Sequence, residues 1–235
     1  MKSDVETLCE AAMDAGRGID LAGCAYGPRF LTAGFLETPP DYYRLLAGLV
    51  RTLDLRRVVE LGTHWGGAIM AMWHGLRDPA SAANRLVTVD VALKNVDGFR
   101  RYPHIRRITG DGLDDRVLDE IARFVEPPVD VVFVDAEHDY RRTRHAIAVY
   151  ASRLAPRFMI LDDIHLNHSM DRLWRDVRGV FGERAFDASR LCDRERCGFG
   201  IVQWDPRVRW PERYGHLVGY WRLRRRLEGW ARRIP

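Results

Sequence analysis

The 235-residue sequence contains little lysine, little cysteine and no long apolar stretch. Its only lysines are Lys2 and Lys94, so a general base inside the fold has to be another residue type. The four cysteines are too few and too irregularly spaced for a disulfide framework. Cys192 and Cys197 lack the second pair of ligands that a zinc site of this kind needs. We therefore expect free thiols in a reducing compartment.

Membrane and export signals are also missing from the sequence. No stretch approaches the roughly 18 consecutive apolar residues of a membrane-spanning helix. Residues 1–10 contain acids and lack the apolar core of a signal peptide. These features predict a soluble, cytoplasmic protein without stable membrane insertion. A chain of this length accommodates one α/β domain with a full core.

Positive charge is concentrated at the carboxyl end. Residues 206–235 carry nine arginines and two glutamates, a net charge of +7, which leaves −3 for the rest of a chain whose total is +4. Tyr220, Leu223, Leu227 and Trp230 follow one another at spacings of three and four. This pattern predicts a basic amphipathic helical extension after a domain of residues 1–205. We expect the extension to pack on the domain or on a second subunit of a homodimer; contact with an anionic surface or a glycan is the alternative.

Apolar strands and amphipathic helices alternate through the body of the chain. Strands are expected at residues 58–61, 85–90, 105–109, 129–135 and 158–161, and near 184–188 and 198–204. Helices are expected at about residues 3–15, 41–50, 68–73, 115–124, 140–154 and 170–181, with a glycine-interrupted loop between the first two. The alternation predicts an α/β fold with a doubly wound, mostly parallel sheet.

A glycine-rich turn joins the first of these strands to the helix that follows. Glycine lets such a turn bend sharply and lets a ligand approach the backbone, while the helix start supplies unpaired N–H groups. A dinucleotide site would read G-x-G-x-x-G, but His64 stands at the second glycine position. The pattern E-x-G-x-x-x-G-G, from Glu60 to Gly67, instead resembles the first motif of class I S-adenosylmethionine (SAM) dependent methyltransferases.

The resemblance implies a fold and a cofactor site. The sheet would be Rossmann-like and seven-stranded, closed by an antiparallel hairpin, with N-terminal helices over the SAM pocket. Glu60, Gly62 and Gly66 would hold the amino acid end of SAM. Asp90 ends the second strand, where a carboxylate can accept both ribose hydroxyls. Asp111 would face the adenine; the alternative is a turn aspartate that bonds its own backbone.

Three further acids follow the fourth and fifth strands. Asp135 ends one strand, and Asp162 and Asp163 end the next. Neighbouring parallel strands would bring the three carboxylates to one rim, where they raise one another's pKa unless a cation lies among them. Oxygen ligands favour magnesium over zinc. We therefore predict a Mg²⁺ site formed by these three residues, with Asp135 also next to the cofactor; helix caps and loop acids are the alternative.

At this point the resemblance becomes narrower. The spacing of the acids looks like the metal triad of magnesium-dependent O-methyltransferases of the catechol O-methyltransferase type. The stretch F-V-D-A-E-H-D-Y, residues 133–140, is similar to the F-I-D-G-D-H-S-Y stretch of a branch that includes sugar and antibiotic O-methyltransferases. It departs from that branch at Ala136, where glycine is usual. The loop after strand 129–135 can therefore differ in backbone geometry from that of the branch.

Three histidines are candidates for the base. The base of the catechol type is a lysine three residues after the first aspartate, and His138 occupies that position here. His165 matches the base position of the macrolide-sugar methyltransferases. His145 would share a face with His138 if one helix included both. An imidazole suits proton transfer near neutral pH, and we expect at least one of the three to act.

These features predict a Mg-dependent O-methyltransferase that acts on a hydroxyl of a polyhydroxylated small molecule, such as a saccharide or a glycosylated natural product. A nucleic-acid methyltransferase is one alternative, but the Asn/Asp-Pro-Pro-Tyr motif usual in amino-methylating enzymes is missing after strand 129–135, so no nucleic-acid partner is expected. Salt-dependent retention on a phosphate resin would favour that alternative. A binding protein with a degenerate nucleotide site is the other, and it would not bind SAM.

Overall fold

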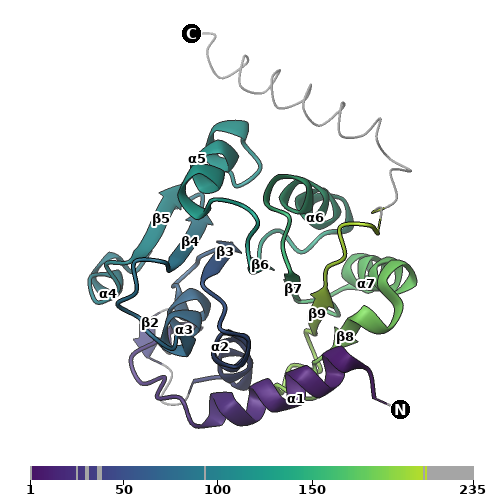
Figure 1. Cartoon of the computed structure of the whole chain (residues 1–235), viewed down its shortest axis with the longest axis horizontal. Helices are drawn as coiled ribbons and strands as arrows, with labels where there is room; N and C mark the ends of the chain where they lie inside the picture. Colours follow the sequence, from purple (N-terminus) through teal and green to yellow (C-terminus); the bar gives the residue numbers. More distant parts are fainter. Residues whose placement is uncertain are drawn as a thin grey trace, which may run out of the picture.

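The computed structural model describes residues 2–24, 26–29, 32–35, 39–92, 94–208 and 210. A seven-stranded sheet lies at the centre, with helices on both of its faces (Figure 1). The extension predicted for residues 206–235 lies outside the described residues from 211 onward. Among the described helices, none is long and apolar enough to cross a membrane.

The sheet has the order β5-β4-β3-β6-β7-β9-β8. Its parallel strands are β3 (Arg57–Leu61), β4 (Arg85–Asp90), β5 (Ile105–Thr109), β6 (Val131–Val134) and β7 (Phe158–Asp162). The antiparallel strands are β8 (Ala185–Asp187) and β9 (Phe199–Gln203), and β9 pairs with β7. The central strands are apolar almost throughout because both of their faces are covered. The predicted Rossmann-like sheet with a closing antiparallel hairpin is confirmed.

The helices form one layer on each face of the sheet. They are α1 (Asp4–Arg17), α2 (Asp41–Leu53), α3 (Gly67–Gly75), the short α4 (Val96–Phe99), α5 (Asp115–Val125), α6 (Tyr140–Leu154) and α7 (His168–Phe181), followed by a 3₁₀ turn at Gly182–Arg184. The predicted helices are present with small shifts at their ends. For example, α7 begins two residues early because the Asn167 side chain accepts from the N–H groups of Ser169 and Met170.

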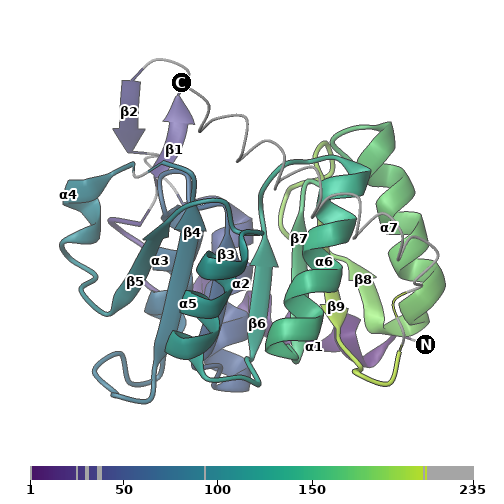
Figure 2. The same ribbon diagram turned by 90° about the horizontal axis from the view of Figure 1, so that it is seen from above.

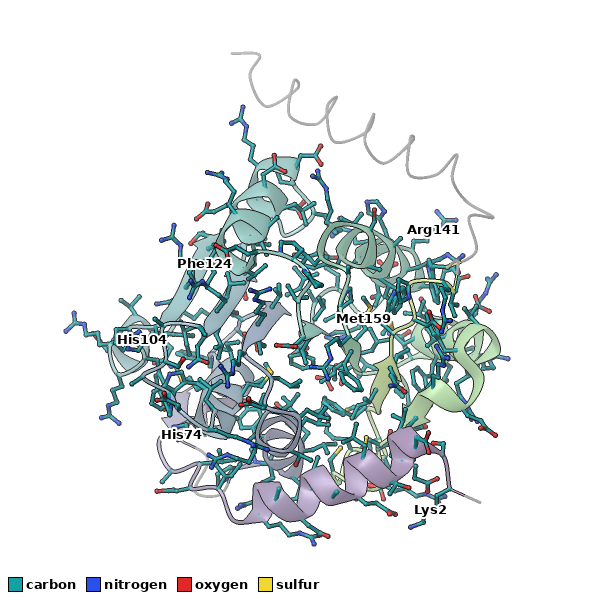
Figure 3. The ribbon with its side chains drawn as sticks, viewed as in Figure 1. Lys2, His74, His104, Phe124, Arg141 and Met159 are labelled. Carbon is teal, nitrogen blue, oxygen red and sulfur yellow. The ribbon has the colours of Figure 1, made fainter. Side chains whose placement is uncertain are left out.

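Alternating side chains of the strands divide the core into two parts. Val58 and Phe133 face the layer of α1, α2 and α3, whereas Val59 and Val132 face the layer of α5, α6 and α7. Met159 of β7 lies well inside the molecule, while Lys2, His104 and Arg141 lie at its periphery (Figure 3). The covered faces of the central strands fix their register, because a slip of one residue would exchange the two faces.

One element differs from the expectation of a loop between the first two helices. β1 (Tyr26–Arg29) and β2 (Thr32–Phe35) form a separate antiparallel pair in which Gly27 lies opposite Gly34. The pair projects beyond the carboxyl end of β4 (Figure 2). The strands are short and contain glycine and proline, which strands usually avoid, so the sequence carries no strand signal here.

Glycines allow close contact in the layer of α1, α2 and α3. A Cβ atom at Gly48 of α2 would lie 1.7 Å from the carbonyl oxygen of Ala12, and one at Gly16 of α1 would lie 2.0 Å from that of Arg44. In the same way, a Cβ at Gly75 of α3 would lie 2.3 Å from the carbonyl oxygen of Ala47. The three helices therefore approach one another backbone to backbone.

Substitution of Gly48 tests this packing. Gly48→Ala should lower the free energy of unfolding by about 1–3 kcal/mol because the added methyl group overlaps the backbone of α1. Gly179→Ala is the matched control: Gly179 is exposed in α7 with no atom within 4 Å of its Cβ position. The control should raise the free energy of unfolding by about 0.5–1 kcal/mol. Urea unfolding measures both, and equal effects would contradict the close contact.

Candidate functional site

The glycine-rich loop lies at the carboxyl end of β3. The strand order reverses between β3 and β6, because β4 and β5 follow on one side of β3, whereas β6 and β7 follow on the other. Such switch points form the crevice in which α/β proteins bind ligands. Gly62 and Gly66 have positive φ angles of 97° and 83°, and His64 has one of 47°. A Cβ at Gly62 would lie 1.9 Å from the carbonyl oxygen of Asp135, so only glycine lets the loop pass the end of β6.

The start of α3 is suited to an anionic group. Gly66 caps this helix without a side-chain hydrogen bond, so a carboxylate of a ligand can use N–H groups of the first turn. The adjoining Gly67 packs on α2, where a Cβ would lie 1.9 Å from the hydroxyl oxygen of Tyr43. The contact of Tyr43 with the helix start is a feature that sequence analysis missed, since Tyr43 reads there only as a core residue.

Glu60 is buried beneath this loop, with only 1% of its surface exposed. The hydroxyl of Thr88 donates a hydrogen bond to its carboxyl group, and the hydroxyl oxygens of Thr88 and Thr63 are 2.6 Å apart. Burial raises the pKa of Glu60 to about 8, although hydrogen bonds from Thr88 and the Ile69 N–H oppose the shift. A cation placed beside Glu60, such as the ammonium group of SAM, would favour its ionised form.

Asp90 and Asp111 lie where the sequence predicted: Asp90 ends β4, and Asp111 follows β5. Asp90 Oδ2 accepts hydrogen bonds from the N–H groups of Thr63, at 3.1 Å, and His64, at 2.8 Å. It therefore holds the glycine-rich loop, and its remaining lone pairs are available to hydroxyl donors. Asp111 is exposed and accepts from the N–H of Leu113 at 2.9 Å, the geometry of a turn aspartate. A contact of Asp111 with adenine stays a prediction.

The three predicted metal ligands lie at the carboxyl ends of β6 and β7, at the same end of the sheet. The side chains of Asp135, Asp162 and Asp163 are 27%, 6% and 15% exposed. Burial raises the pKa of Asp135 well above its usual range, and the charges of Asp162, Glu60 and Asp163 add to the shift. Burial also raises the pKa of Asp162. We call Asp135, Asp162 and Asp163 the carboxylate rim.

Arg194 occupies this rim, and sequence analysis missed it. Its Nη2 atom donates to both carboxylate oxygens of Asp162, at 2.6 and 2.7 Å, and to Asp163 Oδ1 at 2.7 Å. Burial opposes the charge of Arg194, but the neighbouring Asp162, Tyr42 and Asp163 raise its pKa. Within the run Asp-Arg-Glu-Arg, residues 193–196, Arg194 looks like part of a solvated turn, so the sequence gives no signal for its position.

The rim in this conformation does not fit the predicted magnesium ion. Carboxylates suit Mg²⁺, but an ion bound to the same three oxygens would require the guanidinium group of Arg194 to leave. Across the described ranges, no group of three or more His, Cys, Asp or Glu side chains is arranged to hold a metal ion. The assignment of Asp135, Asp162 and Asp163 as metal ligands stays a prediction.

The three candidate bases have different surroundings. His138 joins the rim, with Nε2 3.3 Å from Asp163 Oδ2 and 3.7 Å from Asp135 Oδ1. The condition for a face shared by His138 and His145 is not met, because α6 begins only at Tyr140, where the Asp139 side chain caps it. His145 lies within α6 and is half-buried.

His165 is bound on both sides away from the rim. Its Nδ1 lies 2.8 Å from Asp171 Oδ1, and its Nε2 lies 2.7 Å from Asp187 Oδ2. Burial opposes protonation, but the hydrogen bonds to the two carboxylates raise the pKa of His165. Because both ring nitrogens already have carboxylate partners, His165 is suited to linking β7, α7 and β8. Among the three, His138 is the histidine that contacts the rim.

The environment of Glu60 predicts a pH-dependent effect of Glu60→Gln on stability. Between the ordinary pKa of about 4.5 and the folded value of about 8, the unfolded chain ionises while Glu60 in the folded chain keeps its proton. The wild type therefore loses stability relative to the glutamine variant as pH rises through this window. The melting-temperature difference between them should change by more than about 2 °C from pH 5 to pH 8.

The exposed Glu195 provides the control for this experiment. Glu195→Gln should give a melting-temperature difference from the wild type that stays constant with pH. Thermal unfolding followed by circular dichroism is sufficient for all three proteins. A constant difference for Glu60→Gln as well would show that Glu60 is ionised in the folded chain.

Comparisons with known proteins agree with this architecture. A family model described as a methyltransferase domain matches residues 59–164, from β3 to just past β7. No curated protein sequence matches the chain. Among solved structures, the O-methyltransferase TomG from Streptomyces achromogenes, involved in tomaymycin synthesis and bound to SAM, is similar with a TM-score of 0.58 and 17% identity. The similarity covers 82% of this chain and 94% of TomG.

Two further structures share the fold. The O-methyltransferase from Bacillus cereus, in complex with S-adenosylhomocysteine (SAH), has a TM-score of 0.54 and 18% identity, with 84% of this chain and 91% of that chain covered. The SAH-bound methyltransferase PaMTH1 from Podospora anserina has a TM-score of 0.53 and 16% identity, with 84% and 88% covered. The match over residues 59–164, the glycine-rich loop after β3 and the strand order of the sheet identify a methyltransferase domain in this chain, with the fold of the solved O-methyltransferases.

Proposed function

We propose that the chain transfers the methyl group of SAM to a hydroxyl group of a small molecule. The observation that carries this proposal is the contact between the cofactor loop and the carboxylate rim, since Gly62 packs against the backbone of Asp135. The Asp135 side chain in turn lies beside His138. A methyl donor in the loop and a hydroxyl at the rim would therefore be neighbours, which is the main requirement of a direct displacement.

The residues around the loop have the chemistry to hold SAM. Glu60 would pair with its ammonium group, and the uncapped start of α3 at Gly66 would receive its carboxylate. Asp90 would accept the ribose hydroxyls with the lone pairs that the loop leaves free. Asp111 would lie toward the adenine. Asp135 borders both the cofactor and the acceptor in this arrangement.

His138 is our candidate for the base. It would take the proton of the acceptor hydroxyl as the oxygen attacks the methyl carbon; the carbon–sulfur bond then breaks, and neutral SAH leaves. The imidazolium formed in this step would be stabilised by Asp163, whose Oδ2 already lies 3.3 Å from Nε2. The step assigned to His138 uses only side chains of this chain and the methyl donor.

We expect a polyhydroxylated acceptor, such as a saccharide or a glycosylated natural product. The carboxylates of the rim can accept hydrogen bonds from several hydroxyl groups. The role of the structurally similar TomG in tomaymycin synthesis supports a natural product over a macromolecule. A cytoplasmic location and a homodimer also stay predictions, and size-exclusion chromatography with light scattering tests the second.

Calorimetric titration with SAM is the first test of this function. We expect saturable binding with a dissociation constant in the range of about 1–100 μM. Asp90→Ala should weaken the binding of SAM, because the variant lacks the carboxylate that accepts hydrogen bonds from the loop and would accept them from the ribose. Failure of the folded wild type to bind SAM would favour a binding protein with a degenerate nucleotide site.

Comparison of two histidine variants tests the assignment of the base. Turnover is measured with labelled SAM and a panel of hydroxylated acceptors. His138→Gln should lower kcat by at least about 100-fold, because the variant lacks the base. The dissociation constant of SAM should stay within about twofold, which is a change of well under about 1.4 kcal/mol in binding free energy. His165→Gln should retain turnover and lose thermal stability, most strongly at low pH, where the charged imidazole pairs with Asp171 and Asp187. The opposite pattern would transfer the role of base to His165.

A further inference from the structure

Arg194 is placed at the rim by a loop that is tied to β7. The loop between β8 and β9 carries Arg194, and the N–H of Arg194 donates to the carbonyl oxygen of Ser189 at 2.8 Å. The far end of the loop is bound to the chain after β7. The N–H of Asp163 donates to the carbonyl oxygen of Gly198 at 3.0 Å, and the N–H of His165 donates to the carbonyl oxygen of Cys197 at 2.7 Å. The backbone thus carries Arg194 next to Asp163.

The side chain of Arg194 is also enclosed. Its guanidinium carbon lies 4.7 Å from the centre of the Tyr42 ring, a cation–π contact with α2. Its Nε atom is buried and has no hydrogen-bond partner within the described part of the chain. Only 22% of the side chain is exposed. These contacts fix the guanidinium group from two sides and hold one of its nitrogens against three carboxylate oxygens.

The charges of the site require a cation at this point. Asp162 is 6% exposed, and two adjacent buried carboxylates without a partner would be costly. A divalent ion is one solution, and an arginine is the other, since a guanidinium group stays charged under all ordinary conditions and binds carboxylates in a fixed geometry. In this chain the arginine already binds Asp162 and Asp163.

We propose that Arg194 is the resident cation of the acceptor site and takes the place of a divalent metal ion, so that methyl transfer in this enzyme does not require one. Arg194 acts as a positioning residue: it holds Asp162 and Asp163 in place and neutralises them. Asp163 in turn contacts His138, so the arginine sets the electrostatic surroundings of the base. The catalytic part of this inference rests on the proposed function, but the binding of a metal ion can be measured without any acceptor.

Binding of Mn²⁺ followed by electron paramagnetic resonance tests the proposal on the full chain. The proteins are the wild type, Arg194→Met and the control Arg196→Met, in which an exposed arginine of the same loop is changed. The wild type and the control should leave Mn²⁺ free. Arg194→Met exposes the carboxylates and should bind Mn²⁺ at least about tenfold more tightly than the wild type, equivalent to about 1.4 kcal/mol.

Each result decides the proposal. Stoichiometric binding of Mn²⁺ by the wild type would overturn it, because the arginine would then yield to a metal ion. Weak binding by all three proteins would also overturn it, because the rim would not be a metal-type site that Arg194 replaces. If Arg194→Met does not fold, Arg194→Lys serves instead, with Mn²⁺ binding again tighter than in the wild type because lysine provides one donor group in place of the planar fork.

A second readout applies once an acceptor is known. Turnover of the wild type should be unchanged by EDTA, whereas Arg194→Met should lose at least about 100-fold in kcat and recover part of it on addition of Mg²⁺. Loss of wild-type turnover in EDTA, restored by Mg²⁺, would overturn the proposal. Absence of methyl transfer to every acceptor would count against the proposed function alone, since the Mn²⁺ result does not depend on it.

Discussion

The whole site depends on β3, which is paired with β4 on one edge and with β6 on the other. A strand in that position has no exposed face and no free edge, so the chain that leaves it must turn at once toward the crevice between the two halves of the sheet. Gly62 makes that turn against the backbone of Asp135. The same contact sets the distance between the glycine-rich loop and the carboxylate rim.

Much of the fold can be predicted from the sequence because its signals are local. β4 and β5 coincide with the expected strands 85–90 and 105–109, since each is a short segment that contains β-branched residues. Asp90 ends β4 and Asp135 directly follows β6, as the apolar stretches before them predict. The hairpin of β1 and β2 could not be predicted, as its strands have neither alternation nor the usual composition.

The part of the site that the sequence does not reveal is made by contacts between distant segments. Arg194 reaches Asp162 only because β9 pairs with β7 and returns the loop to the rim. His165 appears equivalent to His138 in the sequence, and their difference arises from Asp171 and Asp187, which lie on α7 and β8. Motif spacing reports which residues are near a strand end. It does not report which of their atoms are already bonded.

Two neighbouring tyrosines give α2 contact with both halves of the site. Tyr43 packs against Gly67, the first residue of α3, and the ring of Tyr42 lies under Arg194. The two rings also pack edge to face, with centres 4.5 Å apart. Adjacent residues of one helix do not move independently, so a shift of α3 that displaces Tyr43 would also displace the ring that lies under Arg194. One turn of α2 thus joins the start of α3 to the carboxylate rim.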